Sequence, residues 1–197
     1  MSSTNRSNAR KEHIADYYIT PTKDIVNFLG HLDNAITLDF SDENQIVLDP
    51  CAGGDENHQM SYPFAMKEYY KIPNTYLRTI DIREDSLADT KGNYLEMQLD
   101  YKPYCIITNP PFNLALSFIQ KALNDVRDGG YVIMLLRLNF LETKARKDFF
   151  DNYMPEYIFV HHKRMSFIEG GGTDSVAYAH YVWRKGYYPE FSKIKVI

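Results

Sequence analysis

Short apolar runs alternate with helix-like spacing along most of this chain, and this order restricts the possible folds more than any other feature of the sequence. The apolar runs are expected to be strands, and they cover 46–48, 75–82, 93–99, 104–108, 131–136, 156–161 and 176–183. The helical patterns cover 22–32, 61–71, 114–126 and 142–153. Strands that alternate with helices favour an α/β fold with a mainly parallel sheet covered on both faces. The loop before the last run has no helical pattern, so the last two strands are expected to pair antiparallel.

The chain has the size and composition of one globular domain. It holds 197 residues, of which 44% are hydrophobic and 24% charged, and about 100 to 200 residues usually make one domain. Residues 1–16 are rich in Ser and Asn and carry Arg6, Arg10 and Lys11. We therefore expect a flexible basic arm at 1–16, followed by a single domain at 17–197 with no separate target-recognition domain.

The remaining composition disfavours several classes of protein. The two cysteines, Cys51 and Cys105, lie far apart in apolar surroundings, so neither a disulfide framework nor a metal site is expected. The amino terminus has no apolar signal run, and no segment approaches the roughly 18 apolar residues of a membrane span. A soluble, cytoplasmic protein is expected. The formal net charge is -4, so binding to nucleic acid has to come from local basic clusters.

Polar side chains follow four consecutive predicted strands, at the point where each strand ends. These residues are Asp49, Asp81, Asp100 and Asn109. In an open sheet of this kind, ligands bind beyond the carboxyl ends of the strands, near the point where the strand order reverses. One Asp after a strand is more often a cap or turn residue. Four in succession are expected to converge on one edge and to form a binding site.

The loop 49–54 has glycines directly behind a strand, which lets a ligand approach the backbone. It matches neither the dinucleotide fingerprint nor the phosphate loop, so a cofactor without a pyrophosphate is favoured. Asp81 is placed to accept hydrogen bonds from ribose hydroxyls. Asp100 is placed to contact an amino group or ring nitrogen of the same ligand.

The turn Asn109–Phe112 stands between a predicted strand and a predicted helix, and its two consecutive prolines can belong to neither. The prolines hold a rigid turn in which the Asn109 amide and adjacent carbonyls face outward from the sheet edge, a suitable geometry for gripping an amino group. The alternative is ordinary punctuation, because Asn-Pro and Pro-Pro are common in loops.

Taken together, these segments resemble the DNA N6-adenine methyltransferases that use S-adenosylmethionine, including small phage-type members. The resemblance covers roughly 17–185 and rests on 16–21, 49–54, Asp81 and 109–112. It implies a class I methyltransferase fold: a Rossmann-like three-layer sandwich around a mixed seven-stranded sheet with an antiparallel carboxyl-terminal edge strand. The implied cofactor residues are Tyr18, Thr20, Pro21, Asp49, Pro50, Ala52, Gly53, Gly54, Asp81, Ile82 and Asp100.

The resemblance also implies how the catalytic turn acts. The exocyclic amine of adenine is a poor nucleophile because its lone pair is delocalised into the ring. The Asn109 side-chain oxygen and the Pro110 carbonyl would accept its two hydrogens and align the lone pair with the methyl group. Pro111 belongs to the same turn, and Phe112 would stack on the base. Neither Asn nor Pro is a general base, so we expect positioning, with the proton lost after transfer.

A base within double-stranded DNA has to flip out to reach such a site. Phe167 resembles the family's second stacking residue and 170–175 the adjoining loop, although Phe167 is as readily a core aromatic. Phosphate contacts are expected from Lys163 and Arg164, and short loops that include Arg137 would read the target. No segment is long enough to be a recognition region, so the alternatives are a homodimer or recognition partner, or low sequence specificity.

Two other functions stay open on the sequence. One is methyl transfer to a protein glutamine or an RNA base amine, since similar turns occur in those enzymes. The other is a module that binds the cofactor without catalysis. For the preferred function, DNA adenine methylation in a restriction-modification setting, a bacterial or phage-infected host cell is expected.

Overall fold

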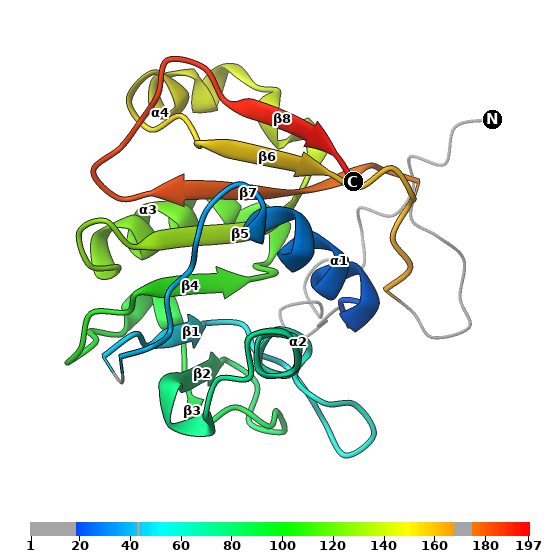
Figure 1. The fold of residues 1–197 in the computed structure, drawn as a ribbon, viewed down its shortest axis with the longest axis vertical. Helices are drawn as coiled ribbons and strands as arrows, with labels where there is room; N and C mark the ends of the chain where they lie inside the picture. Colours follow the sequence, from blue (N-terminus) through cyan, green and yellow to red (C-terminus); the bar gives the residue numbers. More distant parts are fainter. Residues whose placement is uncertain (1–18, 43, 168–174) are drawn as a thin grey trace.

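The computed structural model describes residues 19–42, 44–167 and 175–197, and within them the chain builds a mixed sheet in the order β3-β2-β1-β4-β5-β7-β6-β8 (Figure 1). Its strands are β1 Val47–Asp49, β2 Leu77–Asp81, β3 Thr90–Lys91, β4 Cys105–Thr108, β5 Tyr131–Arg137, β6 Tyr157–Val160, β7 Tyr178–Arg184 and β8 Lys193–Val196. The neighbouring strands from β3 to β5 are parallel, β7 is antiparallel to both β5 and β6, and β8 is parallel to β6.

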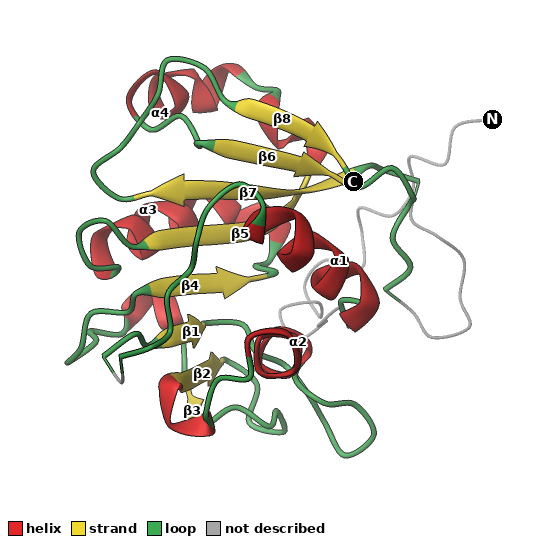
Figure 2. Ribbon diagram, viewed as in Figure 1, coloured by secondary structure: helices red, strands yellow, loops and turns green. Residues whose placement is uncertain are grey.

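Helices cover both faces of the sheet (Figure 2). The α-helices are α1 Thr22–Asp33, α2 Ser61–Tyr70, α3 Ala115–Asp125 and α4 Lys147–Asn152. One apolar core joins α1 and α2 to the sheet, and a second joins α3 and α4 to it. Short 3-10 helices lie at Asn74–Tyr76, Tyr94–Glu96, Phe112–Leu114, Leu138–Leu141 and Lys144–Arg146. The expected α/β three-layer arrangement is confirmed.

The central strands are apolar throughout because both of their faces are covered. All four residues of β4 are buried, as are the first six of β5, and parallel strands covered on both sides lose the usual polar alternation. Helix α3 buries Phe118, Ile119 and Ala122 on one side, a spacing typical of a helix packed on a sheet. None of the helices in the described residues is long and apolar enough to cross a membrane.

The prediction of a strand at 93–99 is wrong. The third strand of the sheet is instead β3, and the chain then turns at Gly92, where φ is +149°. Asn93 follows, and its side chain accepts a hydrogen bond from the Leu95 backbone nitrogen at 3.2 Å, which starts a 3-10 helix over Tyr94–Glu96. Asn commonly caps a helical turn in this way, and here the cap overrides the apolar spacing.

The sheet also has one strand more than expected. The additional strand, β8, alternates Lys with apolar residues and all four of its side chains are exposed, so no buried pattern marks it. It forms the edge, while the antiparallel strand β7 lies inside the sheet between β5 and β6. The helix expected at 142–153 is shorter, because Thr143 adopts a φ of +132° and α4 begins only at Lys147.

Candidate functional site

Two hydrogen bonds join the end of β4 to the loop after β1. The Thr108 hydroxyl donates to Asp49 Oδ1 at 2.5 Å, and the Cys51 backbone nitrogen donates to the same oxygen at 3.1 Å. Asp49 is 2% exposed, and burial raises the pKa of its carboxyl to about 7 against the opposing effect of the Thr108 bond. Asp49 Oδ2 is buried and has no hydrogen-bond partner among the described residues.

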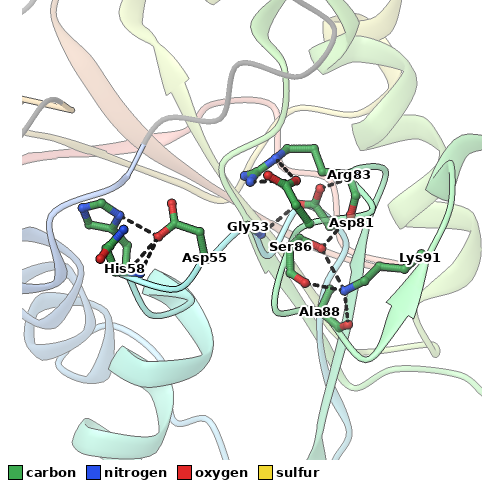
Figure 3. A network of polar contacts seen from close by, with 10 residues as sticks. Gly53, Asp55, His58, Asp81, Arg83, Ser86, Ala88 and Lys91 are labelled. Carbon is green, nitrogen blue, oxygen red and sulfur yellow. Dashed lines mark hydrogen bonds and ion pairs between the residues drawn. The ribbon is translucent and has the colours of Figure 1, made fainter.

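Asp81, at the end of β2, organises the glycine loop. Its Oδ2 accepts a hydrogen bond from the Gly53 backbone nitrogen at 2.7 Å, and its Oδ1 accepts one from the Arg83 backbone nitrogen at 2.8 Å (Figure 3). Asp81 is buried, yet an ionised carboxylate has about four acceptor positions. The two backbone bonds therefore leave capacity for a ligand's hydroxyl groups.

The backbone of the glycine loop is strained for any other residue. Gly53 and Gly54 have φ of +63° and +77°, and a Cβ added to Gly54 would lie 3.0 Å from Met60 and 3.1 Å from Leu87. Pro50 and Ala52, also expected at the site, are buried beside this loop. The sequence therefore needs glycine here both for the conformation and for the space.

A lysine holds the segment that faces this loop. Lys91 Nζ donates to the backbone oxygens of Ser86 and Ala88, each at 2.6 Å (Figure 3). Leu87, between them, donates from its backbone nitrogen to Gly53 O at 3.1 Å. The Leu87 side chain is 48% exposed and that of Ile82 49%. Ile82 directly follows β2, and Leu87 is bonded through its backbone to the glycine loop, so both lie at the carboxyl end of β2.

The loop that continues from Gly54 closes on itself. Asp55 Oδ1 lies 2.9 Å from the His58 ring nitrogen Nδ1 and accepts a hydrogen bond from the His58 backbone nitrogen, also at 2.9 Å (Figure 3). The loop therefore has its own polar contacts before α2 begins at Ser61.

Asp100 does not join this group, and its expected place at the carboxyl end of a strand is corrected. It precedes β4 by five residues and lines a cavity of about 410 Å³ with Ile46, Arg78 and Tyr101, toward the amino ends of the strands. The polar residue beyond β3 is instead Asn93, since Gly92 donates its backbone nitrogen to Asp81 O at 2.8 Å. The sequence signal for Asn93 is the Gly-Asn pair, which is common in turns, whereas the expected strand begins at Asn93.

The Asn109 turn has a defined orientation. Asn109 Nδ2 donates to the Thr20 hydroxyl at 3.1 Å, which places the turn against the segment that enters α1 after Pro21. Asn109 Oδ1 is buried and has no hydrogen-bond partner among the described residues. Pro110 is buried, while Pro111 is exposed and precedes the 3-10 helix Phe112–Leu114.

An aromatic cluster stands beside the turn. The Phe112 and Tyr178 ring centroids are 5.5 Å apart, and Phe167 meets Tyr178 edge-on at 4.9 Å. The Arg137 guanidinium lies over the Phe112 ring, 4.8 Å from its centroid. The structure thus brings together Phe112, Phe167 and Arg137, which the sequence singled out separately. Tyr178 was missed, because it reads as one more residue of a buried strand.

Arg164 and Lys163 are exposed, and Arg164 Nη1 donates to the Ser175 backbone oxygen at 2.7 Å, three residues before Tyr178. The expected basic arm at 1–16, Tyr18 and most of the expected loop 170–175 lie outside the described residues. Thr108 and Leu87 are further contributors that sequence reasoning missed. Thr108 was visible as a hydroxyl beside Asn109, whereas nothing in the sequence marks Leu87.

No family model matches the sequence, and no curated protein matches it. Solved structures do. A proposed class I S-adenosylmethionine-dependent methyltransferase from Listeria monocytogenes superposes with a TM-score of 0.64 at 14% identity, over 91% of this chain and 65% of that one. The chain has the class I methyltransferase fold. The M protein of the type I restriction enzyme EcoKI matches with a TM-score of 0.58 at 15% identity, over 88% of this chain and 45% of that one.

A proposed RNA methyltransferase from Pyrococcus horikoshii is also similar, with a TM-score of 0.54 at 12% identity, over 86% of this chain and 88% of that one. At these identities the likeness concerns the fold. This chain spans less than two thirds of the Listeria protein and less than half of the EcoKI M protein. The similarity therefore does not carry the activities and partners of those whole proteins over to this chain.

Proposed function

We propose that this protein transfers a methyl group from S-adenosylmethionine to the exocyclic N6 amine of adenine in DNA. One observation carries the proposal: at the carboxyl end of β4, Asn109 has a buried side-chain oxygen with no partner in the described part of the chain, beside a rigid Pro-Pro turn. A buried acceptor that stays unpaired costs about 1 to 3 kcal/mol. A donor group on a bound ligand would satisfy it.

The residues at the neighbouring strand ends fit the cofactor. Asp81 would accept hydrogen bonds from the ribose hydroxyls, and Ile82 and Leu87 would contact the faces of the adenine ring. The close approach to Gly53 and Gly54 admits the methionine part, and the unpaired Asp49 Oδ2 would accept from its amino group. Thr20, Pro21, Pro50 and Ala52 would shape the same pocket. When bound, the cofactor supplies a methyl group on a positively charged sulfur.

The turn would prepare the acceptor amine. Asn109 Oδ1 and the Pro110 carbonyl would each accept one N–H of the amine, so that its lone pair points at the methyl group. Phe112 and Pro111 would hold the base plane, and the amine would lose its proton after transfer. Asn109 cannot take that proton itself, since a side-chain amide is not a base near neutral pH.

Double-stranded DNA is the preferred substrate because the turn stands beside an aromatic cluster. A flipped base needs stacking partners, and Phe112, Phe167 and Tyr178 gather there with Arg137. Arg164 and Lys163 are exposed cations suited to phosphate contacts. The similarity to an M protein supports DNA, and a recognition partner or homodimer would contribute to target recognition.

The test combines labelled cofactor with three acceptors. The protein is incubated with methyl-labelled S-adenosylmethionine and duplex DNA, RNA or total protein, and each product is digested to its monomers. Label in N6-methyladenine from DNA is expected. Label only in RNA or in glutamine would replace the proposed substrate. Cofactor that binds without any transfer, across varied DNA sequences, would leave a binding module and refute the proposal.

A further inference from the structure

The loop that follows β5 leaves the sheet beyond the end of β4. Thr108, the last residue of β4, is paired with Met134, and β5 continues for three more residues to Arg137. Because a strand rises about 3.3 Å per residue, Arg137 lies about 10 Å past the level of Thr108. Its guanidinium lies over the Phe112 ring. The loop 138–146, here called the rim loop, therefore starts at the rim of the proposed acceptor site.

The rim loop is held in one shape by its own side chains and by β7. Arg146 Nη1 donates to the backbone oxygen of Phe140 at 2.7 Å and to that of Glu142 at 2.9 Å. The Arg146 guanidinium also lies over the Phe140 ring, 4.4 Å from its centroid. The Tyr181 hydroxyl of β7 donates to the Leu138 backbone oxygen at 3.3 Å. One cation thus ties the end of the loop to its beginning, and the sheet fixes the beginning.

The backbone of the rim loop is strained at Thr143. Its φ of +132° and ψ of +137° lie in a region that favours glycine. Lys71 also has a positive φ, but its value of +57° with a ψ of +30° is the ordinary left-handed end of a helix. Strained backbone persists where the surrounding contacts over-determine it, and such positions cluster in functional segments. The contacts of Arg146 supply that constraint here.

The rim loop presents an apolar side chain among cations. Leu141 is 41% exposed, and the exposed residues Lys144 and Lys147 follow it within six positions. Leu114, at the other end of the site, is equally exposed, but the nearest basic residue along its segment is Lys121, seven positions on. Exposure of one leucine is ordinary by itself. A leucine on a strained, pinned loop beside cations is a more specific arrangement.

Base flipping creates a need for such a side chain. A base that leaves a duplex breaks its pair and leaves its neighbours unstacked. Proteins that open a base step commonly insert an apolar residue such as Leu into it. A side chain on a rigid loop loses less conformational freedom on insertion than one on a mobile loop. Cations beside it would hold the phosphates that flank the opened step.

We propose that Leu141 is a wedge residue, which enters the base stack of the DNA when the target adenine flips out toward Asn109. Arg146 holds the rim loop in the shape that presents this side chain, and Lys144 contacts an adjacent phosphate. The inference rests on the proposed function, and it goes beyond that function by naming the element that opens the duplex.

The first test removes the need for a wedge from the substrate. The target sequence is read from DNA methylated by the wild type, and duplexes of that sequence are made with the target adenine opposite thymine or opposite an abasic position. The abasic duplex has no base pair to break. We expect Leu141→Ala to lower kcat/KM about 10- to 100-fold on the paired duplex and to stay within about threefold of the wild type on the abasic one. Equal losses on both duplexes, or no loss on either, would overturn the proposal.

Three further variants control for size, exposure and loop shape. Leu141→Met keeps an apolar side chain of similar volume and should retain most of the activity on the paired duplex. Ile194→Ala removes an apolar side chain of β8 that is 65% exposed, and it should match the wild type on both duplexes. Arg146→Gln loosens the rim loop and should show the same selective loss as Leu141→Ala. The cofactor dissociation constant should stay within about twofold in all of them.

The second test needs no methyl transfer. A duplex with 2-aminopurine in place of the target adenine fluoresces when that base leaves the stack. Saturating wild type should raise the fluorescence, and saturating Leu141→Ala should raise it at least about twofold less. If the wild type methylates no DNA, the proposed function fails and the wedge fails with it. If the wild type methylates DNA and Leu141→Ala matches it in both tests, only the wedge fails.

Discussion

Side chains in this site fix one another across segments that are far apart in the sequence. Thr20 holds the amide of Asn109, and Thr108 holds the carboxyl of Asp49. Thr108 and Asn109 are adjacent, so in the proposed function the cofactor side and the acceptor side of the site meet at the end of one strand. A substitution at Asn109 is therefore expected to change the transfer rate, and a substitution at Thr108 the affinity for the cofactor.

Replacing Asn109 by Ala should slow transfer strongly and spare cofactor binding. The change removes the buried acceptor that would hold the amine, and loss of one such preorganised group lowers kcat by about 100- to 1,000-fold. Single-turnover rates and the cofactor dissociation constant measure the two effects separately. Asn124→Ala, an exposed asparagine of α3, is the matched control and should match the wild type. Equal rates in the two variants would contradict the role of Asn109.

Replacing Asp81 should mainly weaken the cofactor. A lost charged hydrogen bond is worth about 1.5 to 3 kcal/mol, which corresponds to a dissociation constant raised about 10- to 150-fold. Because Asp81 also accepts from Gly53 and Arg83 backbone nitrogens, Asp81→Ala removes loop contacts as well. Asp81→Asn keeps part of them and is the sharper variant, to be titrated by calorimetry. An unchanged constant in folded Asp81→Asn would refute the ribose role.

The elements of the fold were predictable to the degree that their side chains are buried. The strands β1, β4 and β5 and the helices α1 and α3 carry continuous apolar stripes, and all were expected close to where they lie. β8 was invisible because its four side chains are exposed, and β3 because two residues form no pattern. Asp100 was misplaced as a direct result, since the strand assumed to end there does not exist.

The residues of the candidate site were predictable only where a local sequence pattern marks them. Asn109, Asp49 and Asp81 were identified because a polar residue after an apolar run is visible in one dimension. Tyr178, His180 and Leu87 were not, since their contacts with Phe112, Tyr62 and Gly53 cross from one element to another. Such pairings depend on strand order, which the alternation of elements leaves open.

Two glycines of the fold offer a matched test of the cofactor loop. Gly54 and Gly129 have nearly the same φ, +77° and +74°, but a Cβ would crowd Met60 and Leu87 at Gly54 and would meet nothing within 4 Å at Gly129. Gly129→Ala should cost about 1 kcal/mol from conformation alone. Gly54→Ala should cost more and should weaken cofactor binding as well. Urea unfolding and calorimetry measure both, and equal behaviour of the two variants would contradict the assignment.

The stability of the folded protein depends on pH through a buried carboxyl of the candidate site. Asp49 is buried at the site without a compensating charge, and its pKa is raised to about 7 from an ordinary 3.8. Between these two values the folded protein binds a proton that the unfolded chain releases. The free energy of unfolding should therefore contain a contribution from Asp49 that is lost as the pH rises from about 4 to 7.

Asp49→Asn should remove that contribution. Asn cannot ionise, so the stability of the variant relative to the wild type should rise by about 2 to 4 kcal/mol between pH 4 and pH 8. Other titrating groups, His161 and His180 included, are common to both proteins and cancel in the difference. Denaturant unfolding at several pH values measures it. Two parallel stability curves would contradict a raised pKa at Asp49.

The position of β7 has a consequence for how the protein is made. This strand pairs with β5 over seven residues and with β6 over four, and it carries Tyr178 and His180. A ribosome releases β5 and β6 well before it releases the strand that lies between them. The nascent chain therefore exposes two unpaired strand edges. It also lacks Tyr178 of the aromatic cluster beside Asn109 and the contact of His180 with Tyr62. If the proposed function holds, the protein stays inactive on the ribosome until the strand that completes its sheet has emerged.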